Sequence, residues 1–197
     1  MARPLVVTDC DEVLLHMVRH FRDWLGEDHG IEFLLEGDPF VQSMKRQENG
    51  NLVPEDEVWR LLQAFFDTQF GRQTEIEGAA AAIAELKRGA DVVVLTNLLD
   101  RYRDGRVSQL VTHGIEVPVF TNQGPKGEAV RRIVEQYGAE RAVFIDDLAQ
   151  HHASAAEILP AISRLHFCGE PAIAAHVPCA LKAGHAHARI DSWAEAL

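Results

Sequence analysis

The sequence has few cysteines and no long hydrophobic run. Its three cysteines, Cys10, Cys168 and Cys179, are an odd number without Cys-x-x-Cys spacing, so they indicate neither a disulfide framework nor a thiolate zinc site. No apolar run reaches the roughly 20 residues that a membrane-spanning helix needs, and the first residues show no signal-peptide pattern. We therefore expect reduced thiols, a cytoplasmic location and no membrane partner.

Basic residues are scarce as well. The 197 residues include 19 lysines and arginines against 30 aspartates and glutamates, a formal net charge of -11. This balance disfavours a broad phosphate-neutralising surface, and hence a nucleic-acid polymer as partner, although a local basic pocket stays open. Apolar residues make up 47% and charged residues 25%, which is typical of a globular chain, and the length suits one domain with a modest insertion.

Short apolar, β-branched runs recur along the chain, and polar residues follow them, as expected of buried strands in a parallel sheet. Amphipathic stretches of helical period lie between these runs. The expected strands are residues 5–8, 91–95, 117–120, 142–145 and 162–167, and the expected core helices are residues 78–88, 101–113, 127–137 and 148–159. The alternation predicts an α/β fold with helices on both faces of a parallel sheet, and a ligand site beyond the carboxyl ends of the strands.

One long stretch, residues 14–77, interrupts this alternation. It contains no convincing strand and has two helical patterns, residues 13–25 and 54–70, joined by a loop over residues 36–53. We interpret it as an inserted helical cap. The predicted division is a core of residues 1–14 and 77–197 and a cap of residues 15–76. Aromatic residues at helical spacings are expected to form the small core of this cap: Trp24, Trp59, Phe65, Phe66 and Phe70.

Two carboxyl groups, on Asp9 and Asp11, stand at alternate positions directly after the first expected strand. Both can project into one crevice as the chain leaves the sheet. One carboxylate could attack an electrophile, while the other protonates a leaving group and then deprotonates water. The same pair could also simply end the strand and cap the next helix, and the spacing alone leaves both interpretations open.

A second acidic pair, Asp146 and Asp147, follows another expected strand, and a hard cation such as Mg²⁺ would relieve the crowding of carboxylates at one edge of the sheet. Lys126, at a helix start, supplies the opposite charge. Thr96 offers a hydroxyl and Asn97 a backbone N–H at a third strand end. Each of these residues also has an ordinary structural explanation as a turn, a helix cap or a solvated charge.

In this order along the chain, four segments resemble the four motifs of the haloacid dehalogenase-like (HAD) hydrolase superfamily. They are residues 6–13 (Val-Val-Thr-Asp-Cys-Asp-Glu-Val), residues 93–97 (Val-Val-Leu-Thr-Asn), Lys126 and residues 143–147 (Val-Phe-Ile-Asp-Asp). Each motif is short, but four in the right order and context are specific. The resemblance implies a Rossmann-like core with a five-stranded parallel sheet and a small all-helical C1 cap inserted after the first strand.

The resemblance also implies catalytic roles. Asp9 would be the nucleophile that forms an aspartyl-phosphate, and Asp11 the general acid and base. Thr96 would donate a hydrogen bond to a phosphoryl oxygen, with Asn97 beside it in substrate binding, and Lys126 would hold the nucleophile and the transferred group. In-line phosphoryl transfer of this kind depends mainly on positioning and charge neutralisation.

The metal implied by the resemblance is Mg²⁺. Its ligands would be Asp9, the backbone carbonyl of Asp11 and Asp146, with Asp147 assisting directly or through water. The aspartate at position 11 distinguishes this chain from the dehalogenase branch, which lacks it. Glu12 departs from the glycine that many members carry there, so it could alter metal affinity or could point outward.

The predicted function is that of a Mg²⁺-dependent phosphomonoester hydrolase acting on a small phosphorylated metabolite. A phosphotransferase or mutase of the same superfamily is an alternative, since it uses both aspartates. A catalytically silent phosphate-binding module is a second alternative, disfavoured because such a module has no need of both Asp9 and Asp11.

Several other residues invite a functional interpretation that their spacing does not support. His151 and His152 follow the second acidic pair and could line the rim of the site, but no zinc signature is present. Cys10 should point away from its two neighbours, into the core, because successive side chains of an extended chain alternate. Lys45 and Arg46 in the cap are cations suited to an anionic substrate, or equally a solvated surface pair.

Overall fold

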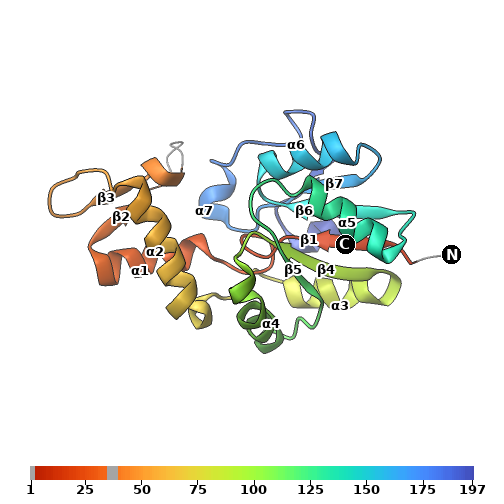
Figure 1. Cartoon of the computed structure of the whole chain (residues 1–197), viewed down its shortest axis with the longest axis horizontal. Helices are drawn as coiled ribbons and strands as arrows, with labels where there is room; N and C mark the ends of the chain where they lie inside the picture. The colour runs from red at the N-terminus through yellow and green to blue at the C-terminus, as the bar shows by residue number, and fades with distance from the viewer. Residues whose placement is uncertain (1–2, 35–39) are drawn as a thin grey trace.

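The computed structural model describes residues 3–34 and 40–197. Its main feature is a six-stranded parallel sheet with the strand order β5-β4-β1-β6-β7-β8, shown on the right of Figure 1. The strands are β1 (Leu5–Thr8), β4 (Asp91–Thr96), β5 (Val119–Thr121), β6 (Ala142–Asp146), β7 (Ser163–His166) and β8 (Ala188–Arg189). All five strands expected from the sequence are present, so the α/β class is confirmed.

The sixth strand corrects the expected number of five. Strand β8 has only two residues, Ala188 and Arg189, which pair with Leu165 and His166 of β7. A two-residue strand is too short to show any periodicity in the sequence. What places it there is tertiary contact, including a hydrogen bond from the backbone N–H of Arg164 to Nδ1 of His187 (3.0 Å).

Helices cover both faces of the sheet, as the alternation predicted (Figure 1). Alternate residues of β1 belong to different hydrophobic clusters: Val6 packs with the helices α3, α4 and α8 on one face, and Val7 packs with α5 and α6 on the other. The helices are α3 (Ala79–Gly89), α4 (Arg103–Thr112, preceded by the 3-10 turn Asp100–Tyr102), α5 (Gly127–Tyr137), α6 (Ala149–Ile158), α7 (Pro171–Ala174) and α8 (Trp193–Ala196). Burial on two faces explains why the strands are almost wholly apolar.

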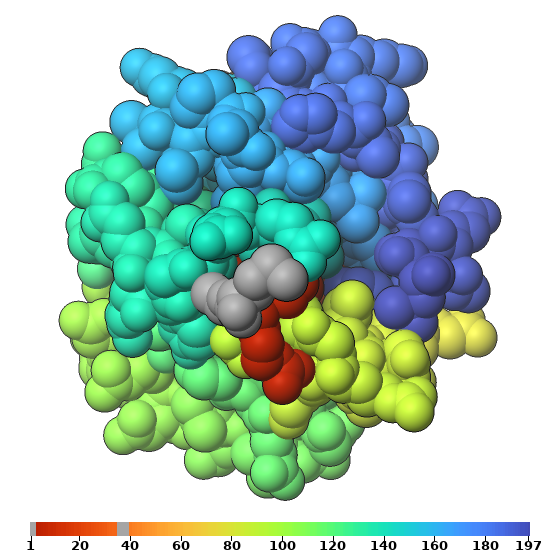
Figure 2. Space-filling model, turned by 90° about the vertical axis from the view of Figure 1, so that its right-hand side faces the viewer, coloured from red at the N-terminus to blue at the C-terminus, as the bar shows by residue number. Residues whose placement is uncertain are grey.

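The end of the core remote from the cap is closed by the N-terminal segment. It enters between α3 and the loop that follows α5, and Figure 2 shows it as the red atoms between yellow-green and teal segments. The backbone N–H of Leu5 donates to the carbonyl of Arg141 (3.0 Å), and that of Asp91 donates to Pro4 (2.8 Å). The polar ends of the strands therefore lie at the opposite edge of the sheet, toward the cap.

The cap lies to the left in Figure 1 and is not all helical, which corrects the prediction. It contains α1 (Val18–His29), β2 (Ile31–Phe33), β3 (Met44–Arg46) and α2 (Glu55–Thr68), with 3-10 turns at Phe40–Gln42 and Phe70–Arg72. Strands β2 and β3 form an antiparallel pair in which Phe33 is opposite Met44. Three-residue strands leave too little alternation to be read from sequence. Residues 36–39 of the predicted loop lie outside the described residues.

The first cap helix begins at Val18 and not at residue 13 as predicted. Val13, Leu14 and Leu15 are fully buried against the sheet, and the backbone N–H groups of all three donate to the carbonyl of Cys10 in a compact turn. Their apolar character continues the helical pattern of α1, but packing on the core decides their conformation. The predicted cap boundary at residues 14–15 falls within this turn and stays a prediction.

Aromatic residues form the core of the cap, as expected. The rings of Phe21 and Phe65 lie 5.4 Å apart, and those of Trp24 and Phe65 lie 5.8 Å apart. Trp59, in contrast, is 46% exposed, so its assignment to this core is wrong. The same cluster includes residues of the α/β part, Leu98, Tyr102, Cys168 and Ile173, through which the cap packs on the core. Among the described residues no helix has the length and apolar character to cross a membrane.

Candidate active site

The carboxyl ends of β1, β4 and β6, which are neighbours in the sheet, bring the predicted polar residues to one edge. The backbone N–H of Asp9 donates to the carbonyl of Ile145 (2.8 Å), so the chain leaving β1 stays paired with β6 beside Asp146. Asp9, Asp146 and Asp147 each place a carboxylate oxygen within 4.8 Å of the others, and all three are buried. The pairing of parallel strands therefore assembles carboxylates that are far apart in the sequence.

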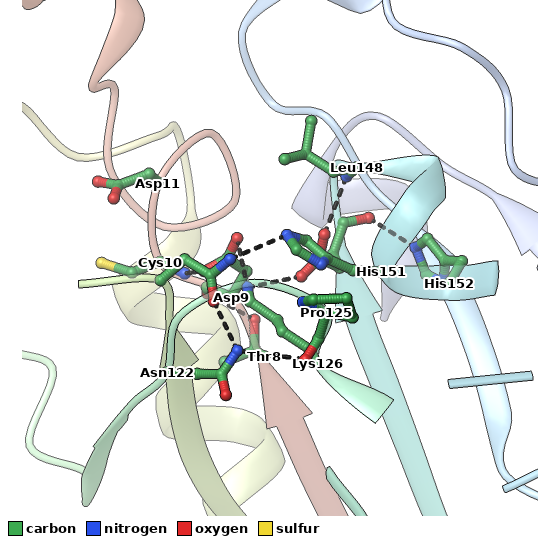
Figure 3. Close-up of polar contacts among 12 residues, drawn as sticks. Thr8, Asp9, Cys10, Asp11, Asn122, Pro125, Lys126, Leu148, His151 and His152 are labelled. Atoms are coloured by element: carbon green, nitrogen blue, oxygen red, sulfur yellow. Dashed lines mark hydrogen bonds and ion pairs between the residues drawn. The ribbon is translucent and has the colours of Figure 1, made fainter. Parts of the chain in front are cut away.

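Lys126 lies between two of these carboxylates, those of Asp9 and Asp146. Its Nζ is 2.8 Å from Oδ2 of Asp9 and 2.7 Å from Oδ2 of Asp146 (Figure 3). Its side chain is fully buried. The remaining oxygens are held by backbone groups: Oδ1 of Asp9 accepts from the N–H of Cys10 (2.7 Å), and Oδ1 of Asp146 accepts from that of Leu148 (2.9 Å). Charge-assisted hydrogen bonds of this kind leave little freedom for either carboxylate.

The position of Lys126 depends on close packing of α5 against α6. Gly127, the first residue of α5, lies so near α6 that a Cβ atom there would be 2.4 Å from the carbonyl oxygen of Ser154. Its backbone N–H donates to Oγ of the same serine (3.0 Å). Glycine is needed here for close approach of two backbones.

Burial and like charge disturb the ionisation of this cluster. Burial raises the pKa of Asp9 to about 7, with Asp146 and Asp11 adding to the effect and Lys126 opposing it. Burial likewise raises the pKa of Asp147 well above its usual value. For Asp146 the Lys126 ammonium outweighs burial and lowers the pKa. The two carboxylates in turn raise the pKa of Lys126 despite its burial.

The donor set fits a divalent metal such as Mg²⁺. Three buried carboxylates face a single ammonium group, so the cluster carries excess negative charge that only bound protons or another cation can neutralise. Oxygen ligands from carboxylates are the ones that Mg²⁺ prefers. Asp9, Asp146 and Asp147 are the residues that would hold such an ion.

Thr96 is the last residue of β4, and its role in phosphate binding stays a prediction. Its side chain is fully buried at the end of β4, and among the residues that the structure describes its Oγ1 has no hydrogen-bond partner. A buried hydroxyl normally has a partner, so this one is free to bind an oxygen of a ligand. Asn97 follows on the exposed side, where its Nδ2 donates to the carbonyl of Gly124 (3.0 Å) and its Oδ1 accepts from Asn122 (2.9 Å). Asn97 thus links the loops that carry Thr96 and Lys126.

Asp11 does not join the cluster in this structure. Figure 3 shows its side chain directed away from Asp9 and Lys126. Both of its oxygens accept hydrogen bonds from Nη2 of Arg106, at 2.8 and 3.0 Å. We did not single out Arg106 from the sequence, yet a signal was present: it stands four residues from both Tyr102 and Leu110, within the apolar face of α4.

Histidines hold the backbone beneath the acidic pair. Nε2 of His152 contacts the carbonyl oxygen of Asp146 at 2.9 Å, and Nε2 of His166 contacts that of Asp147 at 2.7 Å. His151 lies at the rim of the site, where its Nε2 is 3.3 Å from Nδ2 of Asn97, and burial lowers its pKa to about 4. His166 was missed because a histidine within a strand is unremarkable in sequence.

The side chain of Glu12 is buried and accepts hydrogen bonds from the backbone. Its backbone has φ 61°, the left-handed region that explains why glycine suits this position. Its Oε1 accepts hydrogen bonds from the N–H groups of Met17 (2.9 Å) and Val18 (2.6 Å), at the start of α1. Glu12 also lies near His16 and Glu170, but Arg19 already binds both oxygens of Glu170 (3.1 and 2.9 Å).

The remaining candidates have structural positions. Cys10 is fully buried in the hydrophobic core, as predicted. Arg46 forms an ion pair with Glu57 at 2.7 Å, and Lys45 is exposed on the same hairpin. This hairpin, β2 and β3, lies at the end of the molecule away from the six-stranded sheet (Figure 1), so the structure does not bring either cation to the strand-end site.

No family model matches the chain, and no curated protein matches it. Solved structures do. A haloacid dehalogenase-like hydrolase from Streptococcus pneumoniae is 13% identical with a TM-score of 0.69, covering 98% of this chain and 95% of its own. A putative phosphoglycolate phosphatase from Lactobacillus plantarum is 12% identical (TM-score 0.66, covering 100% and 98%). A putative β-phosphoglucomutase from Thermotoga maritima is 15% identical (TM-score 0.63, covering 95% and 94%).

At these identities the likeness shows the fold. The chain has the fold of the haloacid dehalogenase-like hydrolases, over nearly its whole length, which confirms the fold that the four motifs predicted. The matched structures carry the names of hydrolases, of putative phosphatases and of a putative β-phosphoglucomutase. Their names do not specify the type of cap, so the C1 assignment stays a prediction.

Proposed function

We propose that the protein is a Mg²⁺-dependent phosphomonoester hydrolase that acts on a small phosphorylated metabolite through an aspartyl-phosphate on Asp9. One observation carries this proposal: a buried lysine, Lys126, bridges the carboxylates of Asp9 and Asp146 at 2.8 and 2.7 Å. A structural role alone does not require an ammonium group between two buried carboxylates with a third buried carboxylate beside them, since burying charge costs free energy. The phosphatases and hydrolases among the structural neighbours support the same chemistry.

In the proposed reaction an oxygen of Asp9 attacks phosphorus, a new P–O bond to Asp9 forms, and the bond to the leaving-group oxygen breaks. Lys126 holds Asp9 through Oδ2, and the backbone N–H of Cys10 holds Oδ1, so the carboxylate has a fixed direction. The free hydroxyl of Thr96 donates to a phosphoryl oxygen. Asp11 then acts in proton transfer, first to the leaving group and later from the water that cleaves the aspartyl-phosphate.

Asp9, Asp146, Asp147 and the backbone carbonyl of Asp11 are the groups that would hold Mg²⁺. When bound, the ion supplies charge neutralisation for the attacking carboxylate and the phosphoryl oxygens. A small-molecule substrate, a cytoplasmic location and the absence of nucleic-acid and membrane partners stay predictions from the sequence.

Hydrolysis of 4-nitrophenyl phosphate by the full chain tests the proposal, with Mg²⁺ and with EDTA. We expect release of nitrophenol that EDTA abolishes and that the Asp9→Asn variant lacks. The matched control is Asp104→Asn, which removes a carboxylate that is 96% exposed and should leave the rate unchanged. Activity that survives both EDTA and Asp9→Asn would refute the mechanism.

A phosphotransferase or mutase is the second candidate, favoured by the structural neighbours named as putative β-phosphoglucomutases. A phosphotransferase or mutase differs from the proposed hydrolase in the molecule that accepts the phosphoryl group from Asp9. With a phosphorylated sugar and a free sugar present together, a transferase forms the new sugar phosphate faster than inorganic phosphate. A silent binding module binds Mg²⁺ but turns over no member of a broad panel of phosphate esters.

A further inference from the structure

Asp11 is held by a compact set of polar side chains on the side away from Asp9. Nη2 of Arg106 donates to Oδ1 (2.8 Å) and Oδ2 (3.0 Å) of Asp11, and Nε2 of Gln73 donates to Oδ1 (3.0 Å). These contacts hold the Asp11 side chain turned away from Asp9 and Lys126. In this arrangement its carboxyl group does not face a leaving group bound at Asp9.

Arg106 is built into the fold and is not a surface cation. It is fully buried, and the rings of Phe66 and Phe70 lie 5.7 and 5.1 Å from its guanidinium carbon. Nη1 donates to Oε1 of Gln73 (3.0 Å) and to Oε1 of Gln109 (2.8 Å). A buried guanidinium must have its charge neutralised, and Asp11 is the acid that forms an ion pair with it.

The partners of Arg106 come from both connections between cap and core. Asp11 follows β1 in the first connection, Gln73 lies in the second, just after the 3-10 turn Phe70–Arg72, and Arg106 is on α4 of the core. Phe66 belongs to α2 of the cap. Movement of the cap relative to α4 would therefore change the contacts that hold Asp11.

We propose that Arg106 is a positioning residue that, together with Gln73, withholds the Asp11 carboxylate from Asp9, and that substrates with good leaving groups are consequently favoured. This inference rests on the proposed phosphohydrolase function. While Arg106 holds Asp11, the leaving-group oxygen departs without a proton from the enzyme, which an aryl oxide tolerates and an alkoxide does not. Release of Asp11 from Arg106 makes proton transfer to the leaving group available.

The test compares two substrates whose leaving groups differ strongly in their need for an acid, 4-nitrophenyl phosphate and an alkyl phosphate such as propyl phosphate. In Arg106→Met the ratio of the alkyl to the aryl kcat/KM should rise about tenfold over that of the native chain, a part of the contribution that a general acid makes. The double variant Asp11→Asn, Arg106→Met should show no such rise. A merely structural role would lower both rates together and leave the ratio unchanged, and an unchanged or lower ratio overturns the proposal.

A second variant tests the same idea without removing the buried guanidinium. Gln73→Glu keeps the length of the side chain, gives Arg106 another carboxylate to pair with and repels Asp11, so it should raise the same ratio. Arg103→Met, which removes an exposed cation from the same helix, is the matched control and should not change it. If the native chain hydrolyses neither ester in an Asp9-dependent way, the function and this inference both fail. If it does and the ratio stays constant, only the role of Arg106 fails.

Discussion

His166 contacts the backbone carbonyl oxygen of Asp147 through Nε2, at 2.7 Å, while its Nδ1 accepts a hydrogen bond from the N–H of Ala180, at 3.0 Å. Because Nδ1 accepts, the proton of the neutral ring is on Nε2, and this nitrogen is the donor to Asp147. Burial lowers the pKa of His166, which favours the neutral form. The imidazole thus connects the segment around Ala180 to the backbone of the second acidic pair.

Replacing His166 should weaken metal binding without touching a metal ligand. Mutation of a residue that hydrogen-bonds to a metal ligand and orients it typically lowers metal affinity by a factor of about 10 to 100. We therefore expect His166→Ala to raise the Mg²⁺ concentration for half-maximal activity about tenfold, measured by metal titration of ester hydrolysis. His176→Ala, an exposed histidine of the same C-terminal segment, is the control. Equal metal dependence in both variants would contradict the orienting role.

Lys126 should matter for both activity and stability. Lys126→Met leaves the carboxylates of Asp9 and Asp146 without their shared ammonium, and losing one partner of a buried ion pair costs about 3 kcal/mol of unfolding free energy. Loss of a group that neutralises charge at the reacting centre should lower kcat about 100-fold. Urea denaturation and ester hydrolysis measure the two effects. Arg131→Met, which changes an exposed cation in α5, the helix that follows Lys126, should change neither, because its ion pairs are with surface glutamates.

The stability of the metal-free protein should fall as the pH rises from about 7 to about 8.5. The pKa of Asp9 is raised to about 7 and that of Glu12 to about 8, in both cases by burial first. In this range the folded state retains protons that the unfolded state has already lost, so raising the pH favours unfolding. The buried histidines do not reverse this trend, because their lowered pKa values act at lower pH.

Mg²⁺ should oppose this loss of stability, since the cation replaces protons in the cluster. Thermal unfolding in EDTA and in Mg²⁺ across the same pH range measures both effects. A melting temperature that rises with pH in EDTA, or that Mg²⁺ does not change at the higher pH, would be inconsistent with the carboxylate cluster described here.

Gly127→Ala should destabilise the protein although alanine is the better helix former. Its Cβ would meet the carbonyl oxygen of Ser154 at 2.4 Å, and forcing atoms into a packed site typically costs about 1 to 3 kcal/mol. Gly89→Ala is the control, because no atom lies within 4 Å of a Cβ there, and it should be neutral or stabilising. Denaturant titration of both variants measures their free energies of unfolding. Equal values for Gly127→Ala and Gly89→Ala would show that α5 and α6 can move apart without loss of stability.

Local patterns were enough to predict the strands that carry the site. The runs that end at Thr8, Thr96 and Asp146 are apolar because both faces of the sheet are covered, and this makes them recognisable without any knowledge of the fold. Strands β2, β3 and β8 could not be found in this way, because two or three residues do not establish a period. The turn at residues 13–15 was assigned to a helix because apolar spacing alone does not distinguish packing on a sheet from one face of a helix.

The sequence by itself determined which chemical groups stand at the ends of the strands, since these residues directly follow the apolar runs, and hence that Asp9, Thr96 and Asp146 would share one edge of the sheet. Only the tertiary structure decided that Lys126 lies between two carboxylates, that His166 supports Asp147, and that Asp11 turns toward Arg106. The physical reason is that strand ends follow from local hydrophobic patterning, whereas the direction of a charged side chain depends on which distant partner neutralises it after burial.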